Sequence, residues 1–121
     1  MARIISFAWT IPALLARRKT VTRRDWPADY ARRFHAGDIV LAYDKNPRAR
    51  GKQIATLRLT HDPYWERGCD MPDDDWEREG FAYLQEQATN VNGTDRATLW
   101  RQMKTTDDGM WVIRFEVVSI P

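Results

Sequence analysis

The chain has 121 residues, of which 43% are hydrophobic, and it carries six Trp, four Tyr and four Phe. This composition fits one compact domain and excludes a disordered chain, while the single cysteine, Cys69, excludes an internal disulfide framework and a cysteine-based zinc site. The net charge of +2 hides a division, because residues 1–58 hold 13 Lys or Arg and 4 Asp or Glu, whereas residues 59–121 hold 6 and 13.

The first half of the chain predicts short strands that alternate with short helices. Pro12 stands in the first turn of a helix, where its missing N–H costs nothing, and Pro27 opens a second helix. Gly37 and Asp38 form a turn into the next strand. The expected elements are a strand at 3–7, a helix from 11 to about 17 or 18 capped by Thr10, an extended segment at 19–24, a helix at 28–34, and strands at 39–43 and 52–60 that flank a polar loop at 44–51.

The second half is turn-rich at 61–72 and then predicts two helices and a strand. Negative charge at 73–75 complements the dipole at the start of a helix that runs to about Gln85, although Gly80 weakens this helix. A loop follows at 90–93, and Thr94 caps a helix that runs to about Met103.

The strand at 110–120 shows the clearest pattern in the chain. Its residues at 111, 113, 115 and 117 point to one face, and those at 112, 114, 116 and 118 point to the other. With no internal repeat and no linker, these short strands and helices predict a single α+β domain over residues 1–121, built around a small sheet or barrel.

The most concentrated charge is the basic run at 17–24, which places five cations in eight residues. These cations repel one another unless an anion or an acidic side chain neutralises them. Guanidinium groups suit phosphate, and a lysine among them is expected to have a lowered pKa, so the run indicates phosphate binding or a neutral amine that acts as a general base. The alternatives are a solvated charged face at the end of a helix, or neutralisation by the acidic second half of the chain.

Lys19 and Thr22 are the residues of this run with catalytic potential. In a regular strand their side chains would face opposite sides, whereas three residues apart in a helical turn they would be neighbours. A cooperative Lys–Thr pair therefore needs a bent or helical connection at this point of the chain.

A second basic stretch lies in the polar loop at 44–51. Together with Lys52, which follows the loop, Lys45, Arg48 and Arg50 surround Pro47. Such residues suit contacts with phosphate, and they suit a solvated turn equally well.

Aromatic residues are candidates for stacking on a base. Trp9 and Trp26 flank the basic run and are the better candidates for a ligand pocket, with Tyr43 as a further one. Trp100 and Trp111 lie on periodic elements and are expected to pack in the core.

Other catalytic and metal-binding patterns are weak in this sequence. Consecutive acidic residues at 73–79 do not converge on one point of a helix, so capping is favoured over cation binding. His35 and His61 have no partner at a ligand spacing, and there is no phosphate-binding glycine loop. The sequence therefore predicts neither a metal nor a cofactor.

Four segments carry a resemblance to a known family. They are 4–7 (IISF) with Trp9, 18–24 (RKTVTRR), 37–40 (GDIV) and 79–81 (EGF). In this order they span nearly the whole chain and resemble the ASCH family. The resemblance implies a PUA-like β-barrel with short helices packed at one side of a positively charged cleft, and an association with RNA.

One branch of small ASCH proteins hydrolyses N4-acetylcytidine with a Lys, a Thr and a Glu as the proposed catalytic set. The resemblance carries these roles onto Lys19, Thr22 and Glu79, although this chain has Arg23 where that branch tends to be apolar. A neutral Lys19 would take the proton of Thr22 as it attacks the amide carbonyl. Arg24 would stabilise the oxyanion or hold a ribose or phosphate, and Glu79 would orient Lys19 or bind the cytosine amino edge.

Pairing of Glu79 with the basic run would act against this scheme, because a nearby carboxylate raises the pKa of a lysine. A non-enzymatic module that binds RNA or a modified base in the same cleft is therefore the alternative, and a ribonuclease is a weaker one. The residues expected to bind substrate or RNA in these schemes are Trp9, Arg18, Arg24, Trp26, Tyr43, Lys45, Arg48 and Arg50.

The first residues of the chain do not resemble a signal peptide, and the apolar stretch at 4–15 is too short to span a bilayer and is broken by Pro12. We therefore expect a cytoplasmic protein with no membrane partner. The oligomeric state is left open, with a monomer favoured.

Overall fold

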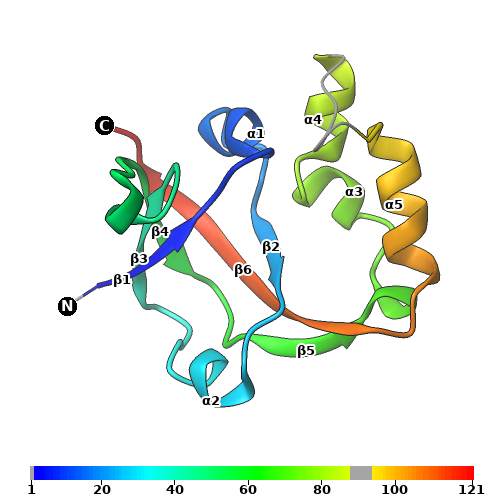
Figure 1. The fold of residues 1–121 in the computed structure, drawn as a ribbon, viewed down its shortest axis with the longest axis horizontal. Helices are drawn as coiled ribbons and strands as arrows, with labels where there is room; N and C mark the ends of the chain where they lie inside the picture. The colour runs from blue at the N-terminus through cyan, green and yellow to red at the C-terminus, as the bar shows by residue number, and fades with distance from the viewer. Residues whose placement is uncertain (1, 88–93) are drawn as a thin grey trace.

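The computed structural model describes residues 2–87 and 94–121, and within them six strands form one mixed sheet (Figure 1). The strands are β1 (Arg3–Ser6), β2 (Val21–Arg24), β3 (Ile39–Tyr43), β4 (Gln53–Leu59), β5 (Tyr64–Arg67) and β6 (Gly109–Ser119). The helices are α1 (Ile11–Leu15), α2 (Ala28–Ala31), α3 (Asp75–Arg78), α4 (Phe81–Glu86) and α5 (Arg96–Thr105), with short 3₁₀ turns η1 (Pro47–Ala49) and η2 (Gly68–Asp70).

The sheet is curled into a half-barrel. Its strand order is β1-β3-β4-β6-β2, with β5 paired to β6 as well. β1 and β3 are parallel, and the other pairs are antiparallel. The open side lies between β1 and β2, and Arg24 crosses it by donating from Nη2 to the carbonyl oxygen of Ser6 at 2.6 Å. The predicted α+β class and small curved sheet are thus confirmed.

The long strand β6 organises the core, as its alternating pattern predicts. Ile113 and Phe115 are buried, and Trp111 and Val117 pack against the same cluster. The opposite face carries Glu116 and Val118, which are exposed. Val112 departs from the two-sided pattern, because it is fully buried on this second face. Burial on both sides shows that this part of β6 lies inside the molecule.

Three helices pack at one side of the sheet, beside β2 and β5 (Figure 1). Phe81 and Leu84 of α4 form a small second core with Ala13 of α1. Trp76 and Trp100 meet edge to face over this core, with ring centroids 5.7 Å apart. Trp100 therefore packs against this second core, as expected from the sequence, although it is only partly buried.

The sequence analysis is wrong at three points in the second half of the chain. The helix expected at 73–85 is two helices, α3 and α4, because Gly80 between them has a left-handed φ of 91°. The stretch expected as turns at 61–72 contains β5, which pairs with β6. Helix α5 is capped by Asp95 rather than Thr94, since the Asp95 side chain accepts from the N–H of Thr98. The loop expected at 90–93 lies outside the described residues.

None of the helices in the described ranges is both long and apolar enough to cross a membrane.

Candidate active-site pocket

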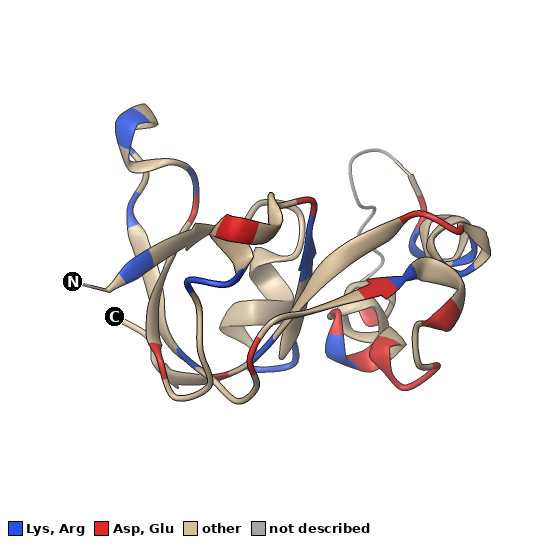
Figure 2. Cartoon of the chain, turned by 90° about the horizontal axis from the view of Figure 1, so that it is seen from below, with Lys and Arg blue, Asp and Glu red and all other residues tan. Residues whose placement is uncertain are grey.

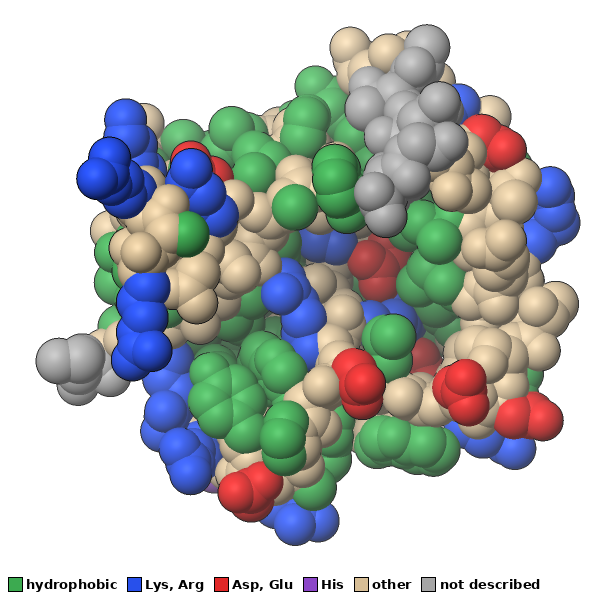
Figure 3. Space-filling model, in the orientation of Figure 1, with side chains coloured by type: hydrophobic (Ala, Val, Ile, Leu, Met, Phe, Trp, Pro, Cys, Tyr) green, Lys and Arg blue, Asp and Glu red, His purple; other side chains and the backbone are tan. Residues whose placement is uncertain are grey.

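A pocket of about 700 Å³ lies between the open side of the sheet and the helical layer. Figure 3 looks into this side of the molecule, where acidic and basic side chains are visible at the bottom of a hollow between hydrophobic ones. The charged and polar residues of the lining are Ser6, Thr10, Lys19, Thr22, Arg23, Arg24, Asp44, Lys45, Asn46 and Glu79, and the larger apolar ones are Phe7, Trp9, Phe81, Leu99, Met103 and Met110.

Lys19 enters this pocket from an irregular segment rather than from a strand. Its N–H donates to the carbonyl oxygen of Ala13 in α1, at 3.1 Å. The next residue, Thr20, donates to the carbonyl of Arg78 at 2.8 Å and accepts from the N–H of Phe115 at 2.9 Å. Because β2 begins only at Val21, strand alternation does not act between Lys19 and Thr22, and both side chains line the same pocket.

Glu79 reaches the pocket because the chain turns sharply after α3. It is the C-terminal cap of α3, and its N–H donates to the carbonyl of Asp75 at 2.8 Å. Gly80 follows in the left-handed conformation that glycine adopts most readily at the end of a helix. A Cβ at Gly80 would lie 2.5 Å from Cβ of Ala13 and 3.4 Å from Cβ of Lys19. The missing side chain therefore lets α3 and α1 approach closely enough for Glu79 to meet Lys19.

Replacement of Gly80 by alanine should destabilise the protein more than the same change at Gly37. Gly37 has nearly the same φ, 90°, but nothing lies within 4 Å of its ideal Cβ. Gly37→Ala should cost about 1–2 kcal/mol of unfolding free energy for the backbone conformation alone. Gly80→Ala should cost about 1–3 kcal/mol more for the steric overlap. Urea unfolding followed by tryptophan fluorescence measures both, and equal losses would contradict the close approach at Gly80.

Lys19 and Glu79 form a buried ion pair. The Nζ atom of Lys19 lies 2.9 Å from Oε1 of Glu79 and 3.1 Å from its carbonyl oxygen, and the side chains are only 2% and 6% exposed. Burial lowers the pKa of Lys19 below its ordinary value of 10.5 and outweighs Glu79, which raises it, while the positive charges of Arg24 and Arg23 lower it further. The amine of Lys19 is therefore held in a site that favours its neutral form.

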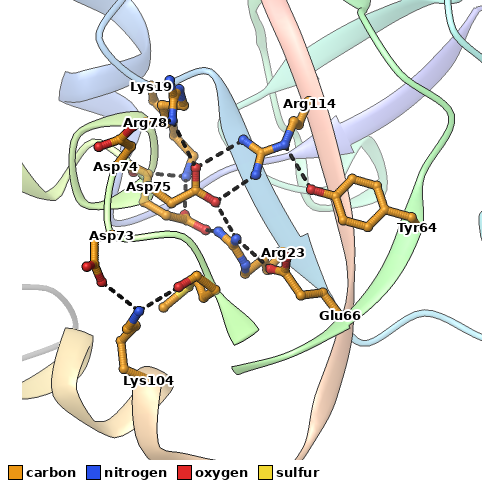
Figure 4. A network of polar contacts seen from close by, with 12 residues as sticks. Lys19, Arg23, Tyr64, Glu66, Asp73, Asp74, Asp75, Arg78, Lys104 and Arg114 are labelled. Atoms are coloured by element: carbon orange, nitrogen blue, oxygen red, sulfur yellow. Dashed lines mark hydrogen bonds and ion pairs between the residues drawn. The ribbon is translucent and has the colours of Figure 1, made fainter. Parts of the chain in front are cut away.

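Arg23 links Glu79 to a network of buried charges (Figure 4). Its guanidinium donates to Oε2 of Glu79 at 2.6 Å, to Oε1 of Glu66 at 3.0 Å, and to Asp75. Burial acts to lower the pKa of Arg23, but the charge of Glu79 and the hydrogen bonds to the three carboxylates raise it above its ordinary value. Arg23 is thus a permanent cation in the wall of the pocket.

Asp75 anchors this network from the other side. It is fully buried and accepts a bidentate interaction from Arg114 at 3.0 and 2.8 Å, in addition to the bond from Arg23. Burial alone would raise the pKa of Asp75, but the hydrogen bonds from Arg114 and Arg23 hold it below its ordinary value. Arg114 in turn donates to the hydroxyl of Tyr64 at 3.0 Å.

The sequence analysis did not single out Asp75, Arg114 or Glu66. Asp75 was grouped with its acidic neighbours as a helix-starting residue, and Arg114 was placed on the second face of β6. The signal that could have found them is Arg114 itself, a cation next to the buried positions 112, 113 and 115. Its carboxylate partner lies 39 residues away in the chain, beyond the reach of local patterns.

Thr22 and Arg24 lie on the pocket side of β2. Thr22 is 5% exposed, and its hydroxyl oxygen accepts from Nε of Arg24 at 3.3 Å. The guanidinium of Arg24 also packs over the ring of Phe7, 5.1 Å from its centroid. Within residues 2–87 and 94–121 Arg24 forms no ion pair, so it is a half-buried cation whose hydrogen bonds go to neutral oxygens.

The pocket brings together six of the eleven predicted site residues, and the other five lie elsewhere. Lys19, Thr22, Glu79, Trp9, Arg24 and Lys45 line it, and Trp9 is 54% exposed at its edge. Trp26 instead stacks on Phe34 with ring centroids 4.7 Å apart. The remaining four are Arg18, Tyr43, Arg48 and Arg50, none of which is among the lining residues.

The two oppositely charged halves of the chain meet at the helical layer (Figure 2). Arg18 pairs with Glu77 and Glu86 on the outside of this layer. Together with the Lys19 and Arg23 pairs, this contact neutralises much of the basic run. Arg48 and Arg50 show no ion pair in the part of the chain that the structure describes, and both are exposed. The charge division thus reflects internal pairing for the run at 17–24, while the loop around η1 stays positive.

The described residues contain no group of three or more His, Cys, Asp or Glu side chains placed to hold a metal ion. The carboxylates of Glu66, Asp75 and Glu79 converge on the guanidinium of Arg23 instead. The buried groups available for chemistry in the pocket are therefore the Lys19 amine with its lowered pKa, the Thr22 hydroxyl, the Glu79 carboxylate and the guanidiniums of Arg23 and Arg24.

The fold and the pocket together define a small α+β domain with a half-barrel sheet and a charged cleft beside it. A similar solved structure is the crystal structure of protein EF3133 from Enterococcus faecalis V583, assigned to the family model DUF984. The two match with a TM-score of 0.62 at 16% sequence identity, over 100% of this chain and 82% of that chain. This likeness supports the fold alone. No protein-family model matches the chain, and no curated protein matches it by sequence.

Proposed function

We propose that the protein handles RNA or a modified nucleoside as an ASCH-type domain, and that it is an amidohydrolase acting on an N4-acylated cytidine. One observation carries this proposal: the amine of Lys19, with its pKa lowered by burial, lines the same pocket as the Thr22 hydroxyl and the Glu79 carboxylate. A basic amine and a hydroxyl that share one pocket supply the base and the nucleophile that attack on an amide requires.

The proposed reaction proceeds in two stages. Oγ1 of Thr22 attacks the carbonyl carbon of the substrate amide, and its proton passes to Nζ of Lys19. The C–N bond then breaks, the cytosine amino group takes the proton from Lys19, and the acyl group remains as an ester on Thr22. A water molecule hydrolyses this ester by the same acid–base exchange with Lys19 and releases the carboxylic acid.

Arg24 is placed to stabilise the charge that develops in this reaction. Its Nε–H already points to the Thr22 hydroxyl, and its positive charge is not shared with an ion-pair partner in the described ranges. A tetrahedral oxyanion formed on Thr22 would thus be close to a half-buried cation, where electrostatic stabilisation is strongest. The exposed ring of Trp9 at the edge of the pocket suits stacking on the pyrimidine.

The test is release of cytidine from N4-acetylcytidine, followed by liquid chromatography. We expect turnover by the intact protein and a loss of about 10³-fold or more in Thr22→Val, which removes the nucleophile at constant shape. Thr20→Val is the matched control, because Thr20 lies two residues earlier and is not among the residues that line the pocket. Equal turnover by Thr22→Val and the control would contradict the assignment of the nucleophile.

A second candidate is a non-enzymatic module that binds RNA or a modified base. The observation that favours it is the positive loop around η1, where Lys45, Arg48 and Arg50 are exposed and Lys45 lines the pocket. The same experiment separates the two candidates. Absence of cytidine, together with RNA binding that weakens steeply as salt is added, would favour the binding module over the hydrolase.

A further inference from the structure

Arg23 is surrounded by carboxylates on three sides. It reaches Glu79 at the end of α3, Asp75 within α3 and Glu66 on β5. A guanidinium is suited to this position, because its five N–H donors lie in one plane and it keeps its charge at any pH of interest. Its side chain is only 7% exposed. Arg23 is therefore an internal cation of the cleft wall.

The position of Arg23 is fixed by further contacts behind it. Asp75 is held by the bidentate interaction with Arg114 of β6, so the carboxylate that receives Arg23 is itself fixed. Glu66 of β5 adds a further contact, and its side chain is 13% exposed. The α3 segment and β5 thus contact the Arg23 guanidinium of β2 directly, and β6 fixes it through Asp75 (Figure 4).

This arrangement occupies both oxygens of Glu79. Oε1 accepts from Lys19 and Oε2 accepts from Arg23. If Lys19 were the only cation beside Glu79, their mutual attraction would keep the proton on the amine. With Arg23 present, Glu79 has a partner that cannot release a proton, and Lys19 is no longer needed to balance it.

The total charge of the cluster is also consistent with a neutral Lys19. Apart from Lys19, and from Arg78 and Asp74, which pair with each other at 3.8 Å and so cancel in the count, the cluster contains three carboxylates and three guanidiniums. They are Glu66, Asp75 and Glu79, and Arg23, Arg24 and Arg114. The cluster is therefore neutral when the amine of Lys19 is neutral. A neutral amine has two N–H bonds, which match the two acceptors that Lys19 has on Glu79, and it keeps one lone pair free.

We propose that Arg23 is a positioning residue, which holds and neutralises the Glu79 carboxylate and so leaves the Lys19 amine able to accept the Thr22 proton. The part that concerns Thr22 rests on the function proposed above, whereas the effect of Arg23 on Lys19 does not. Arg23 acts through Glu79 and the charge balance of the cluster, without touching the reacting atoms.

The titration of Lys19 depends on every charged group that faces the cluster. In the described part of the chain, α4 and α5 contribute only apolar side chains to the lining of the pocket. The groups that face Lys19 and Arg23 are Glu79, Asp75 and Arg78 from the α3 segment, Arg24 from β2, Glu66 from β5, Arg114 from β6, and Asp44 and Lys45 from the loop after β3. Removal of Arg23 leaves the three carboxylates with less positive charge around them, which favours a protonated Lys19.

The test is the titration of Lys19 in the folded protein, read from its ¹³Cε chemical shift and assigned by the loss of this signal in Lys19→Met. In Arg23→Leu the midpoint should rise by about one to three pH units, because a neighbouring cation has been removed. The low-pH limb of the kcat profile for N4-acetylcytidine should move in the same direction. Arg23→Lys, which keeps the charge, should return the midpoint most of the way to that of the wild type.

Arg58→Leu is the matched control, because it removes an exposed guanidinium that pairs with Glu116 on the outer face of the sheet. It should leave the Lys19 midpoint unchanged. If Arg23→Leu does not fold, Arg23→Gln removes the charge with a polar side chain and is measured instead. A folded, uncharged variant with an unchanged midpoint would overturn the proposal. A wild-type protein that releases no cytidine while the midpoint moves would remove the proposed hydrolase but leave the role of Arg23 in place.

Discussion

Replacement of Asp75 by alanine should destabilise the protein by about 3–5 kcal/mol, because it removes one partner from a buried network of charges. Asp75 is 0% exposed and accepts hydrogen bonds from Arg23 and Arg114, whose side chains are 7% and 16% exposed. Without it, Arg114 keeps only the hydrogen bond to the hydroxyl of Tyr64 among the described residues, and a largely buried guanidinium loses its carboxylate partner. Since domains of this size are stable by about 5–15 kcal/mol, this loss is a large share of the total.

Asp74→Ala is the matched control for this prediction. Asp74 precedes Asp75 directly, but it is 83% exposed and lies 3.8 Å from its nearest cation, Arg78. An exposed pair of this kind contributes about 0.2–1 kcal/mol. Chemical denaturation of the two variants, followed by circular dichroism, compares an exposed with a buried carboxylate at adjacent positions. Losses of similar size would show that the network around Asp75 does not stabilise the fold.

The pH dependence of stability gives a second measurement of Asp75. Its pKa is lowered in the folded protein, so the unfolded chain binds a proton first as the pH falls below 3.8. The contribution of the Asp75 carboxylate to the free energy of unfolding is fully present above pH 3.8. It is lost as the pH falls through the pKa that Asp75 has in the folded protein. Asp75→Ala should lack this part of the acid-induced loss, whereas Asp74→Ala should retain it.

The parts of the fold that the sequence predicted are those specified by local patterns. The alternation in β6 is long enough to assign a face to each residue, and Ile113 and Phe115 are buried as expected. β5 was missed because it is short, its Trp65 is 56% exposed, and it is stabilised by pairing with the distant β6. Gly80 was recognised as a weak point of a helix, but its left-handed φ depends on the close contact with Ala13, which only the tertiary structure shows.

The candidate site was likewise only partly predictable from the sequence. Lys19, Thr22 and Glu79 were carried over from a resemblance, and nothing in their spacing showed that they would share a pocket. The sequence left open whether Glu79 would disable Lys19 by pairing with it. The pair forms, but burial and the charges of Arg23 and Arg24 oppose its effect on the pKa of Lys19. Such a balance depends on distances among four groups and could not be predicted from the sequence.

Replacement of Lys19 by methionine should lower the rate of cytidine release by about 10²–10⁴-fold, the usual contribution of a general base. Methionine keeps most of the length of the side chain, so the packing beside Gly80 should be retained. In the folded wild type, Lys19 loses its proton at a lower pH than in the unfolded chain, where its pKa is 10.5. Between these two values the unfolded state binds more protons, so this group makes wild-type stability rise with pH up to 10.5.

Lys19→Met should remove this rise and should not lose its fold, which separates an effect on catalysis from an effect on stability. Lys52→Met is the matched control: it deletes the same amine from an exposed position outside the pocket lining and should change neither activity nor the pH slope. A Lys19→Met variant that keeps more than a tenth of the wild-type rate would exclude Lys19 as the base. A variant that loses activity but keeps the wild-type pH slope of stability would mean that Lys19 stays protonated in the folded protein and acts as a positive charge rather than as a base.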